Sequence, residues 1–527
     1  MTYKTALLSK LDVAVEEAEQ ELKKKHSFYI PKLDKDGKLQ SITIDRVKLL
    51  EILMENGFFR YDLGVDRFCF IQVLDKKVKQ VSITYIMDWW FSYLKELPNY
   101  SWVTSRRDEE GENIHVTVKN DYIQNKFLMA VGSYVSDSIL SRLTTEKEIK
   151  FNADSKIAKY LYYQNGFVTI CKEQYWFTSD YSLLKHHIWE NQILNRDYNQ
   201  EQKENFKSSE FFKFCFNISN QDEKRLLSLQ TIIGYLLHDF YHYKMRATIL
   251  TDAQIGVDGE ANGRTGKGIF ANGLKCMLNN LDNKEAKVYC QINGKGFDFN
   301  DKHRYSNAGI NTKLIHLEDI KAYFLFDNLF NDITESVTVD KKNEIPFNIF
   351  VKMLISTNKT IQIKGASAKD RAIQFEFSEH YSEVHSPEDE FGHWLFTDWN
   401  QKEWELFDCF MVNSIWQFFK NDAQVIEPET INLTRRSLIE HSSQEFIDFM
   451  DYYGFTDEDH EKDTPVGNYI VPEHEKQKEY IKKELYNEFV ENYPDMTKNK
   501  RFTQARFTKW LRAYTEASFI LTPINSK

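Results

Sequence analysis

The sequence is poor in cysteine and proline, and it lacks long apolar runs. Its six cysteines form no C-x₂-C pair, which argues against a zinc ribbon and gives no sign of a disulfide framework. No apolar run reaches the length of a membrane span, and residues 1–26 have the pattern of a charged amphipathic helix rather than of a signal peptide. We therefore expect a cytoplasmic protein, in a bacterial host, with no membrane partner.

Acidic residues outnumber basic ones, with 79 Asp and Glu against 68 Lys and Arg. The formal net charge of −11 argues against a general nucleic-acid coat, although a local basic track remains compatible with it. No internal repeat or low-complexity segment is visible. No D-x-D or D-x-E pair ends a strand pattern, because Asp34 and Asp36 lie in a glycine turn. A priming activity, if the system has one, is therefore expected on a separate protein.

A glycine-rich segment, DGEANGRTGKGIF at Asp258–Phe270, is the most informative feature present. Its glycines allow backbone N–H groups to converge on a polyphosphate, and Lys267 adds a positive charge for the β- and γ-phosphates. An apolar run at Ala247–Leu250 precedes it, and Phe270–Leu278 can continue as a helix whose N-terminus faces the anion. The alternative is a plain glycine turn. The predicted phosphate-binding residues are Ala261, Asn262, Gly263, Arg264, Thr265, Gly266, Lys267 and Gly268.

Two further strand patterns end in polar residues. LIHLED, at Leu314–Asp319, is an apolar strand pattern that delivers Glu318 and Asp319, and KMLISTN, at Lys352–Asn358, ends on an amide. Carboxylates at a strand end, in register with a phosphate loop, can hold Mg²⁺ and polarise a water molecule. Arg371 precedes a third, alternating strand pattern, in a position suited to an arginine finger.

Together these motifs resemble those of the superfamily 3 helicases of viruses, phages and plasmids, and they are especially similar to the helicase half of poxvirus-type primase-helicases. The resemblance covers about Asp222–Tyr381. It rests on the order of GEANGRTGKG, LIHLED, the hairpin-like ESVTVDKKNEIPF, KMLISTN and KDRAIQFEF.

The resemblance implies a role for each residue that matches. Lys267 would bind phosphate, and Glu318 and Asp319 would be the catalytic and Mg²⁺-binding acids. Asn358 would be the sensor of the γ-phosphate, and Arg371 would act on the ATP of a neighbouring subunit.

The resemblance also implies a DNA contact, and the sequence departs from the family motif at two positions. Lys341 and Lys342 fall where the family carries DNA-binding residues on a hairpin in the ring pore, and a solvated turn is the alternative reading of this lysine pair. Ala261 stands in place of a glycine, and Gly268 stands in place of the Ser or Thr whose hydroxyl holds Mg²⁺. We expect these two departures to affect Mg²⁺ affinity and turnover, and to leave the phosphate-binding backbone of the glycine-rich segment in place.

The expected fold is α/β, with a P-loop AAA+-like motor core, an N-terminal α/β module and a C-terminal helical, winged-helix-like domain. The expected divisions are an N-terminal mixed α/β module (1–100), a pre-motor module similar to the N-terminal region of poxvirus-type helicases (101–220), the superfamily 3 P-loop ATPase motor (221–385), a helical segment packed on the motor (386–455) and the winged-helix-like domain (456–527).

We expect an ATP-dependent DNA helicase or translocase of a phage or mobile-element replication system. It would act as a homo-oligomeric ring, a hexamer, on single-stranded and fork DNA, with ATP and Mg²⁺ and with a separate primase or replication initiator. One alternative is an ATP-binding switch or scaffold in replication or defence whose hydrolysis is weak because Gly268 has no hydroxyl. Another alternative is a small-molecule or nucleotide kinase. That function does not explain why the sequence has the hairpin lysines, Asn358 and Arg371 in one chain.

Overall fold

The structure is a computed structural model, and it divides the chain into two compact units. The first contains Met1–Asn152 and Asp180–Gln192, and the second contains Ala153–Ser179 and Ile193–Lys527. The described residues are 17, 20–64, 67–107, 111–146, 149–241, 245–253, 264–278, 288–320, 324–342, 346–358, 361, 363, 366–431, 438, 442–452, 482–494, 496 and 502–518.

The first unit mixes helices with mainly antiparallel strands around an aromatic core, and its one parallel pair among the named strands is β11 with β5. A sheet of order β11-β5-β4-β3 is its largest, and two hairpins, β1-β2 and β6-β7, accompany it. Phe28, Phe58, Trp90 and Phe127 are fully buried in its core. The elements are β1 Tyr29–Leu33, β2 Leu39–Ile44, α2 Arg46–Glu55, β3 Phe58–Gly64, β4 Arg67–Leu74, β5 Lys77–Val81, α3 Ile83–Glu96, β6 Tyr100–Arg107, β7 Asn113–Val118, α4 Asn120–Met129, α5 Asp137–Leu140 and β11 Ile188–Trp189.

The second unit begins with a four-stranded sheet of order β10-β9-β8-β12 and two helices. Asp222 caps the second of these helices, because its carboxylate accepts the backbone N–H of Arg225 at 2.8 Å. The elements are β8 Ala158–Tyr163, β9 Gly166–Cys171, β10 Tyr175–Thr178, β12 Ile193–Leu194, α6 Glu210–Ile218 and α7 Glu223–Leu237.

A five-stranded, wholly parallel sheet of order β14-β15-β18-β13-β19 follows in the second unit. Every residue of β13, ATILTD, is buried, as a central strand of a parallel sheet requires. The elements are β13 Ala247–Asp252, α8 Lys267–Leu278, β14 Tyr289–Asn293, β15 Leu314–Glu318, α9 Phe330–Thr334, β16 Val337–Val339, β17 Phe347–Ile349, β18 Lys352–Ser356, α10 Ala366–Lys369, β19 Ala372–Phe377, α11 Pro387–Phe391 and α12 Gln401–Lys420.

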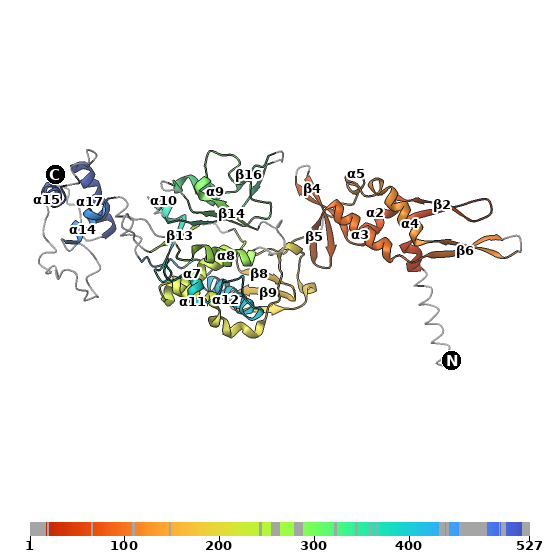
Figure 1. The fold of residues 1–527 in the computed structure, drawn as a ribbon, viewed down its shortest axis with the longest axis horizontal. Helices are drawn as coiled ribbons and strands as arrows, with labels where there is room; N and C mark the ends of the chain where they lie inside the picture. The colour runs from red at the N-terminus through yellow and green to blue at the C-terminus, as the bar shows by residue number, and fades with distance from the viewer. Residues whose placement is uncertain are drawn as a thin grey trace. The chain divides into compact units, whose positions relative to one another are not determined.

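Both faces of this sheet are covered, because its strands alternate side chains between two cores. Leu250, Leu354 and Phe375 join the core that contains α6, α7, α8 and α12. Ile249 and Ile355 point to the other face, towards a core built with α9, α10 and the β16-β17 hairpin. Figure 1 shows α7 and α12 on one side of this sheet and α9 and β16 on the other. The Phe side chains of α12 are therefore core, and its two Trp side chains are partly buried against that core.

The end of the chain forms a helical cluster with its own aromatic core. Phe446, Phe489, Phe507 and Trp510 are buried in it. The helices are α14 Gln444–Tyr452, α15 Lys482–Asn492 and α17 Gln504–Ser518. α15 and α17 both lie within the division 456–527 that was expected to be winged-helix-like. Residues 453–481 and 519–527 lie outside the described residues.

The mixed α/β class predicted from the sequence is confirmed in both units. All six cysteines are free thiols. Within the described part of the chain, no helix combines the length and the apolar character that a membrane span requires.

Candidate functional site

The segment around Lys267 lies between a buried strand and a helix, as the sequence predicts. β13 ends at Asp252, and α8 begins at Lys267. Arg264, Thr265, Gly266, Lys267 and Gly268 are described. Ala261, Asn262 and Gly263 lie outside the described residues.

The Lys267 side chain is held at the carboxyl edge of the sheet by two acceptors. Its Nζ forms an ion pair with the Asp252 carboxylate and donates to Asn358 Oδ1 at 2.8 Å. Lys267 is only 11% exposed, and Asp252 is fully buried. The Thr265 hydroxyl donates to the same Asp252 oxygen. A buried carboxylate needs such partners, so Asp252 fixes the lysine and the threonine in one place.

Gly266 has a backbone conformation that a side chain would disturb. Its φ is +97°, and a Cβ there would lie 2.6 Å from the ring of Phe214 on α6. Gly268 is different, because a Cβ at that position meets no atom within 4 Å. The glycine at 266 is therefore required by geometry, and the one at 268 leaves room for a larger residue.

The two predicted acids lie at the same edge of the sheet as Lys267. Glu318 is the last residue of β15 and is paired in register with Ser356 of β18, two residues before Asn358. Gln291 Nε2 donates to Glu318 Oε2 at 2.5 Å. Asp319 has a φ of +55°, and its N–H donates to the Ser356 carbonyl at 2.9 Å. The parallel register therefore brings Glu318, Asp319 and Asn358 to one edge.

Asp319 also has a partner that the sequence did not point to. Its carboxylate forms an ion pair with Lys295 Nζ at 2.5 Å, and both side chains are largely exposed. The pair is at a solvent-facing position, where an ion pair contributes little to stability. The Asp319 carboxylate thus lies next to an exposed cation and is partly open to solvent.

A buried histidine links the strands beneath these acids. The His316 ring is hydrogen-bonded to Tyr289 Oη at 2.6 Å and to Ser356 Oγ at 2.8 Å. Burial lowers the pKa of His316 to about 4, so the ring is neutral at pH 7. His316 precedes Glu318 by two residues and therefore shares its face of β15. It joins β14, β15 and β18 just below the edge that carries the acids.

Arg371 lies at the amino ends of the strands, at the opposite end of the sheet from the carboxyl ends that carry Lys267 and the acids. Its carbonyl accepts the N–H of Ala247, at the start of β13, whereas Asp252 pairs with Phe377 at the far end. Five steps along a strand span about 17 Å, so Arg371 is far from Lys267 of the same chain. Its guanidinium lies over the Phe330 ring at 4.8 Å, and Nη1 donates to the Ser367 carbonyl at 2.9 Å. The structure does not bring Arg371 to the other site residues.

The predicted hairpin forms, with its lysines in the connecting loop. β16 and β17 pair in antiparallel register, from Val337 opposite Ile349 to Val339 opposite Phe347. Lys342 is exposed, and Lys341 Nζ lies 5.9 Å from the centre of the Phe347 ring. The hairpin leads directly into the amino end of β18. Lys341 and Lys342 are therefore on an element that joins the sheet at the edge opposite Lys267.

The sequence interpretation missed Asp252, Gln291 and Lys295. Asp252 is the last residue of a buried strand, as Glu318 is, and this shared position is a signal that could have identified it. Gln291 and Lys295 lie on β14 and just after it, and no sequence pattern links them to the acids. Strand pairing alone brings them there.

Comparisons with known proteins do not assign a family. No protein-family model matches the chain, and no curated protein matches it. Solved structures of the NrS-1 C-terminal region do match. The A-form apo structure of this region is 13% identical, with a TM-score of 0.34 over 89% of this chain and 90% of that chain. The apo structure of region 305–718 is also 13% identical, with a TM-score of 0.34 over 82% and 84%.

A further A-form apo structure of region 305–718 is 12% identical, with a TM-score of 0.35 over 90% of this chain and 91% of that chain. Identities and TM-scores this low carry no argument about fold or function.

Proposed function

We propose that this chain is an ATP-hydrolysing motor of the superfamily 3 helicase type that moves single-stranded DNA. The observation that carries the proposal is the convergence at the carboxyl edge of the parallel sheet. There, the amino end of α8 supplies Lys267, and the ends of β15 and β18 supply Glu318, Asp319 and Asn358. A phosphate-binding cation, acids and a γ-phosphate sensor are the parts that nucleoside triphosphate hydrolysis needs.

The sheet topology supports a ligand at this place. The chain leaves β13 towards β14, at one end of the strand order, and after β18 it passes to β19 at the other end. β13 and β18 are thus neighbours whose following connections run in opposite directions. In open α/β sheets, ligands bind outside the carboxyl ends of strands at such a switch point. Lys267 and Asn358 follow these two strands.

Each residue has a stated role in the proposal. The amino end of α8 and Lys267 bind the phosphates, since a helix N-terminus presents free N–H groups and a partial positive charge. Glu318 accepts a proton from, and orients, the attacking water. Asn358 contacts the γ-phosphate through its amide. The carboxylate oxygens of Glu318 and Asp319 are donors of the kind that Mg²⁺ prefers, and when bound the ion would neutralise phosphate charge.

Arg371 supports an oligomeric ring in this proposal. It lies at the amino end of β13, about 17 Å along that strand from Asp252, so in this proposal it acts on the nucleotide of a neighbouring subunit. A neighbouring subunit's nucleotide remains accessible to a residue on the opposite edge. The ring, proposed as a hexamer, would belong to the replication system of a phage or mobile element and work with a separate primase or initiator.

Replacing Lys341 and Lys342 by alanine tests the DNA-binding role. We expect the variant to lose DNA unwinding and the increase in ATPase rate that single-stranded DNA causes, with the rate without DNA as the internal reference. The log–log salt dependence of single-strand binding should also flatten by roughly 0.7 for each phosphate that the variant no longer neutralises. ATPase rates and binding at several salt concentrations measure both effects.

Lys207→Ala/Lys402→Ala is the matched control, because it removes two exposed lysines outside the hairpin. It should behave as the wild type does. Wild-type unwinding and salt dependence in the Lys341/Lys342 variant would show that these lysines form a solvated turn.

A second candidate function is an ATP-dependent switch with slow hydrolysis. Two observations favour it: Gly268 offers no hydroxyl to Mg²⁺, and the Lys267 charge is already balanced by the buried Asp252. In such a protein ATP binding would change the conformation, and DNA would not accelerate turnover. The DNA dependence of the ATPase rate therefore separates the two functions.

Gly268→Ser tests the missing hydroxyl directly. A Cβ at this position has open space, and serine has a higher helix propensity than glycine by roughly 0.5 kcal/mol, so we expect the variant to fold. The added oxygen should strengthen the Mg²⁺ dependence or the turnover, because Mg²⁺ favours oxygen ligands. ATPase rates over a Mg²⁺ titration measure the effect. A large loss of ATP binding would show instead that the backbone at 268 needs glycine.

A further inference from the structure

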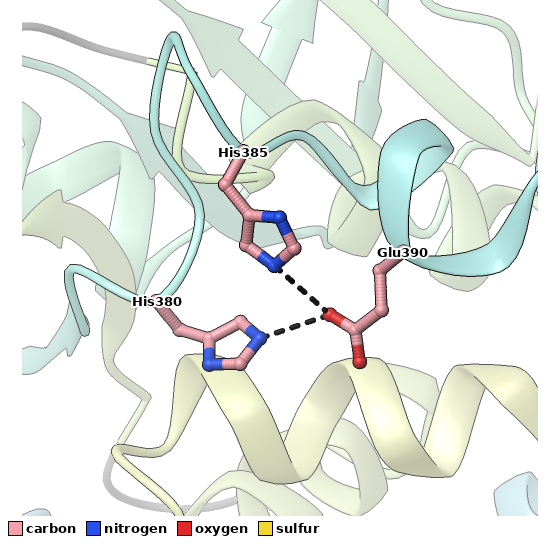
Figure 2. Close-up of side chains that lie close together, drawn as sticks. All are labelled: His380, His385 and Glu390. Carbon is pink, nitrogen blue, oxygen red and sulfur yellow. Dashed lines mark hydrogen bonds and ion pairs between the residues drawn. The ribbon is translucent and has the colours of Figure 1, made fainter.

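Three potential metal ligands lie close together just after β19, outside the site described above. His380 and His385 belong to the loop that follows β19, and Glu390 lies on α11. Figure 2 shows both imidazole rings directed at one carboxylate oxygen. One ligand atom from each side chain lies within 4.8 Å of the other two. This is the one such group among the described residues.

The spacing of the three ligand atoms fits a small transition-metal ion. His380 Nε2 lies 2.9 Å from Glu390 Oε2, and His385 Nε2 lies 3.6 Å from the same oxygen. Ligands at the usual zinc distances of about 2.0–2.1 Å in a tetrahedron are roughly 3.3 Å apart. The two observed separations lie on either side of that value.

The carboxylate is held in place by a neighbouring helix. Asn217, on α6, donates from Nδ2 to Glu390 Oε1 at 2.9 Å and to Tyr381 Oη at 3.0 Å. This contact occupies Oε1 and leaves Oε2 directed towards the histidines. Partners that orient a ligand in this way are typical of metal sites.

The start of α11 is also fixed. Ser386 Oγ accepts the N–H of Asp389 at 3.2 Å, and the Asp389 carboxylate accepts the N–H of Ser386 at 2.8 Å. This capping box sets the first turn of the helix. Glu390 follows directly, so its position relative to His385 depends on local hydrogen bonds rather than on a free loop.

We propose that His380, His385 and Glu390 bind one Zn²⁺ ion. Two imidazoles and a carboxylate suit zinc, whereas Mg²⁺ and Ca²⁺ take oxygen ligands. The three side chains are between 26% and 45% exposed, so a fourth ligand position is open to water. The ion is separate from the nucleotide and is not required by the proposed motor function.

The proposed ion would stabilise the loop that contacts the phosphate-binding segment. Tyr381 stacks on Phe214 at 5.5 Å, and Phe214 is the residue that lies against Gly266. On the same loop, Glu383 forms an ion pair with Arg264 at 2.8 Å. The ion would therefore hold this loop against the start of α8.

Zinc titration of the full chain, first freed of metal with a chelator, tests the proposal. Competition with a chelating dye should show one tight equivalent of Zn²⁺, and Zn²⁺ should raise the melting temperature. His385→Asn and Glu390→Gln should each lose this equivalent and the thermal shift. The affinity should fall by at least about 100-fold, because losing even an outer partner of a ligand costs 10–100-fold.

These variants should fold, because His385 is 45% exposed and glutamine at 390 keeps an oxygen for Asn217. His393→Gln is the matched control, because His393 forms a single His–Glu pair with Glu210 at 3.0 Å and should leave zinc binding unchanged. Equal zinc binding in the wild type and in Glu390→Gln would overturn the proposal. So would a site that Mg²⁺ fills as well as Zn²⁺. ATPase assays play no part in this test, so its outcome is independent of the motor function.

Discussion

Lys267→Ala is expected to abolish ATP binding at concentrations that saturate the wild type. Lys267 is the buried cation at the start of α8, whereas Arg264 is exposed and paired with Glu383. A hydrogen bond to a charged group contributes about 1.5–3 kcal/mol, so losing the lysine should weaken ATP binding by roughly 10- to 150-fold. Isothermal titration or equilibrium dialysis with ATP measures the loss.

The same substitution should also destabilise the fold, which requires a second variant. Without Lys267, the fully buried Asp252 carboxylate loses its ion-pair partner, at a cost of about 3–5 kcal/mol. Lys267→Ala/Asp252→Asn removes both charges and should recover most of that stability in thermal unfolding. It should still fail to bind ATP. ATP binding of wild-type strength in a folded double variant would show that the phosphate site has been misassigned.

Arg371→Ala is expected to reduce ATP hydrolysis by roughly 10³–10⁵-fold, the contribution of arginine fingers in nucleoside triphosphatases. It should spare ATP affinity far more than Lys267→Ala does, because Arg371 lies at the opposite edge of the sheet from the phosphate-binding residues. Single-turnover ATPase rates and ATP titrations separate the two effects. Lys369→Ala, which removes an exposed cation two residues away, is the control and should retain the wild-type rate.

Mixed oligomers test whether Arg371 acts on the neighbouring subunit. Arg371→Ala and Glu318→Gln subunits are each expected to be inactive alone. In a mixture, one kind of interface joins an intact arginine with intact acids, so part of the activity should return. If mixed oligomers demonstrably form and no activity returns, Arg371 acts within its own chain or is structural.

The sequence could predict that the site residues meet, because they follow or end strands of a parallel sheet. Lys267, Glu318 and Asn358 each follow a buried strand pattern, and parallel strands deliver their carboxyl ends to one edge. The hairpin at Val337–Ile349 was predictable too, because alternation and a turn are local signals. The mixed α/β class followed from the same patterns.

Other features depend on packing that no local pattern encodes. The strand order, which places β18 between β15 and β13, is not encoded by any local pattern, and it brings Asn358 to Lys267. Asp252 and Lys267 are 15 residues apart, and no strand or helix pattern predicts that they pair. His380 and Glu390 are ten residues apart and meet because the loop and α11 fold back on α6. The assigned roles of the site residues stay predictions.

The steady-state ATPase rate of the wild-type chain, measured over a range of single-stranded DNA concentrations, tests the central claim most directly. The proposed motor should hydrolyse ATP in a Mg²⁺-dependent reaction whose rate rises with DNA and saturates. The Lys267→Ala/Asp252→Asn variant should show neither the basal nor the stimulated rate. A wild-type protein that hydrolyses no ATP at any DNA concentration, or whose rate DNA does not change, would contradict the account.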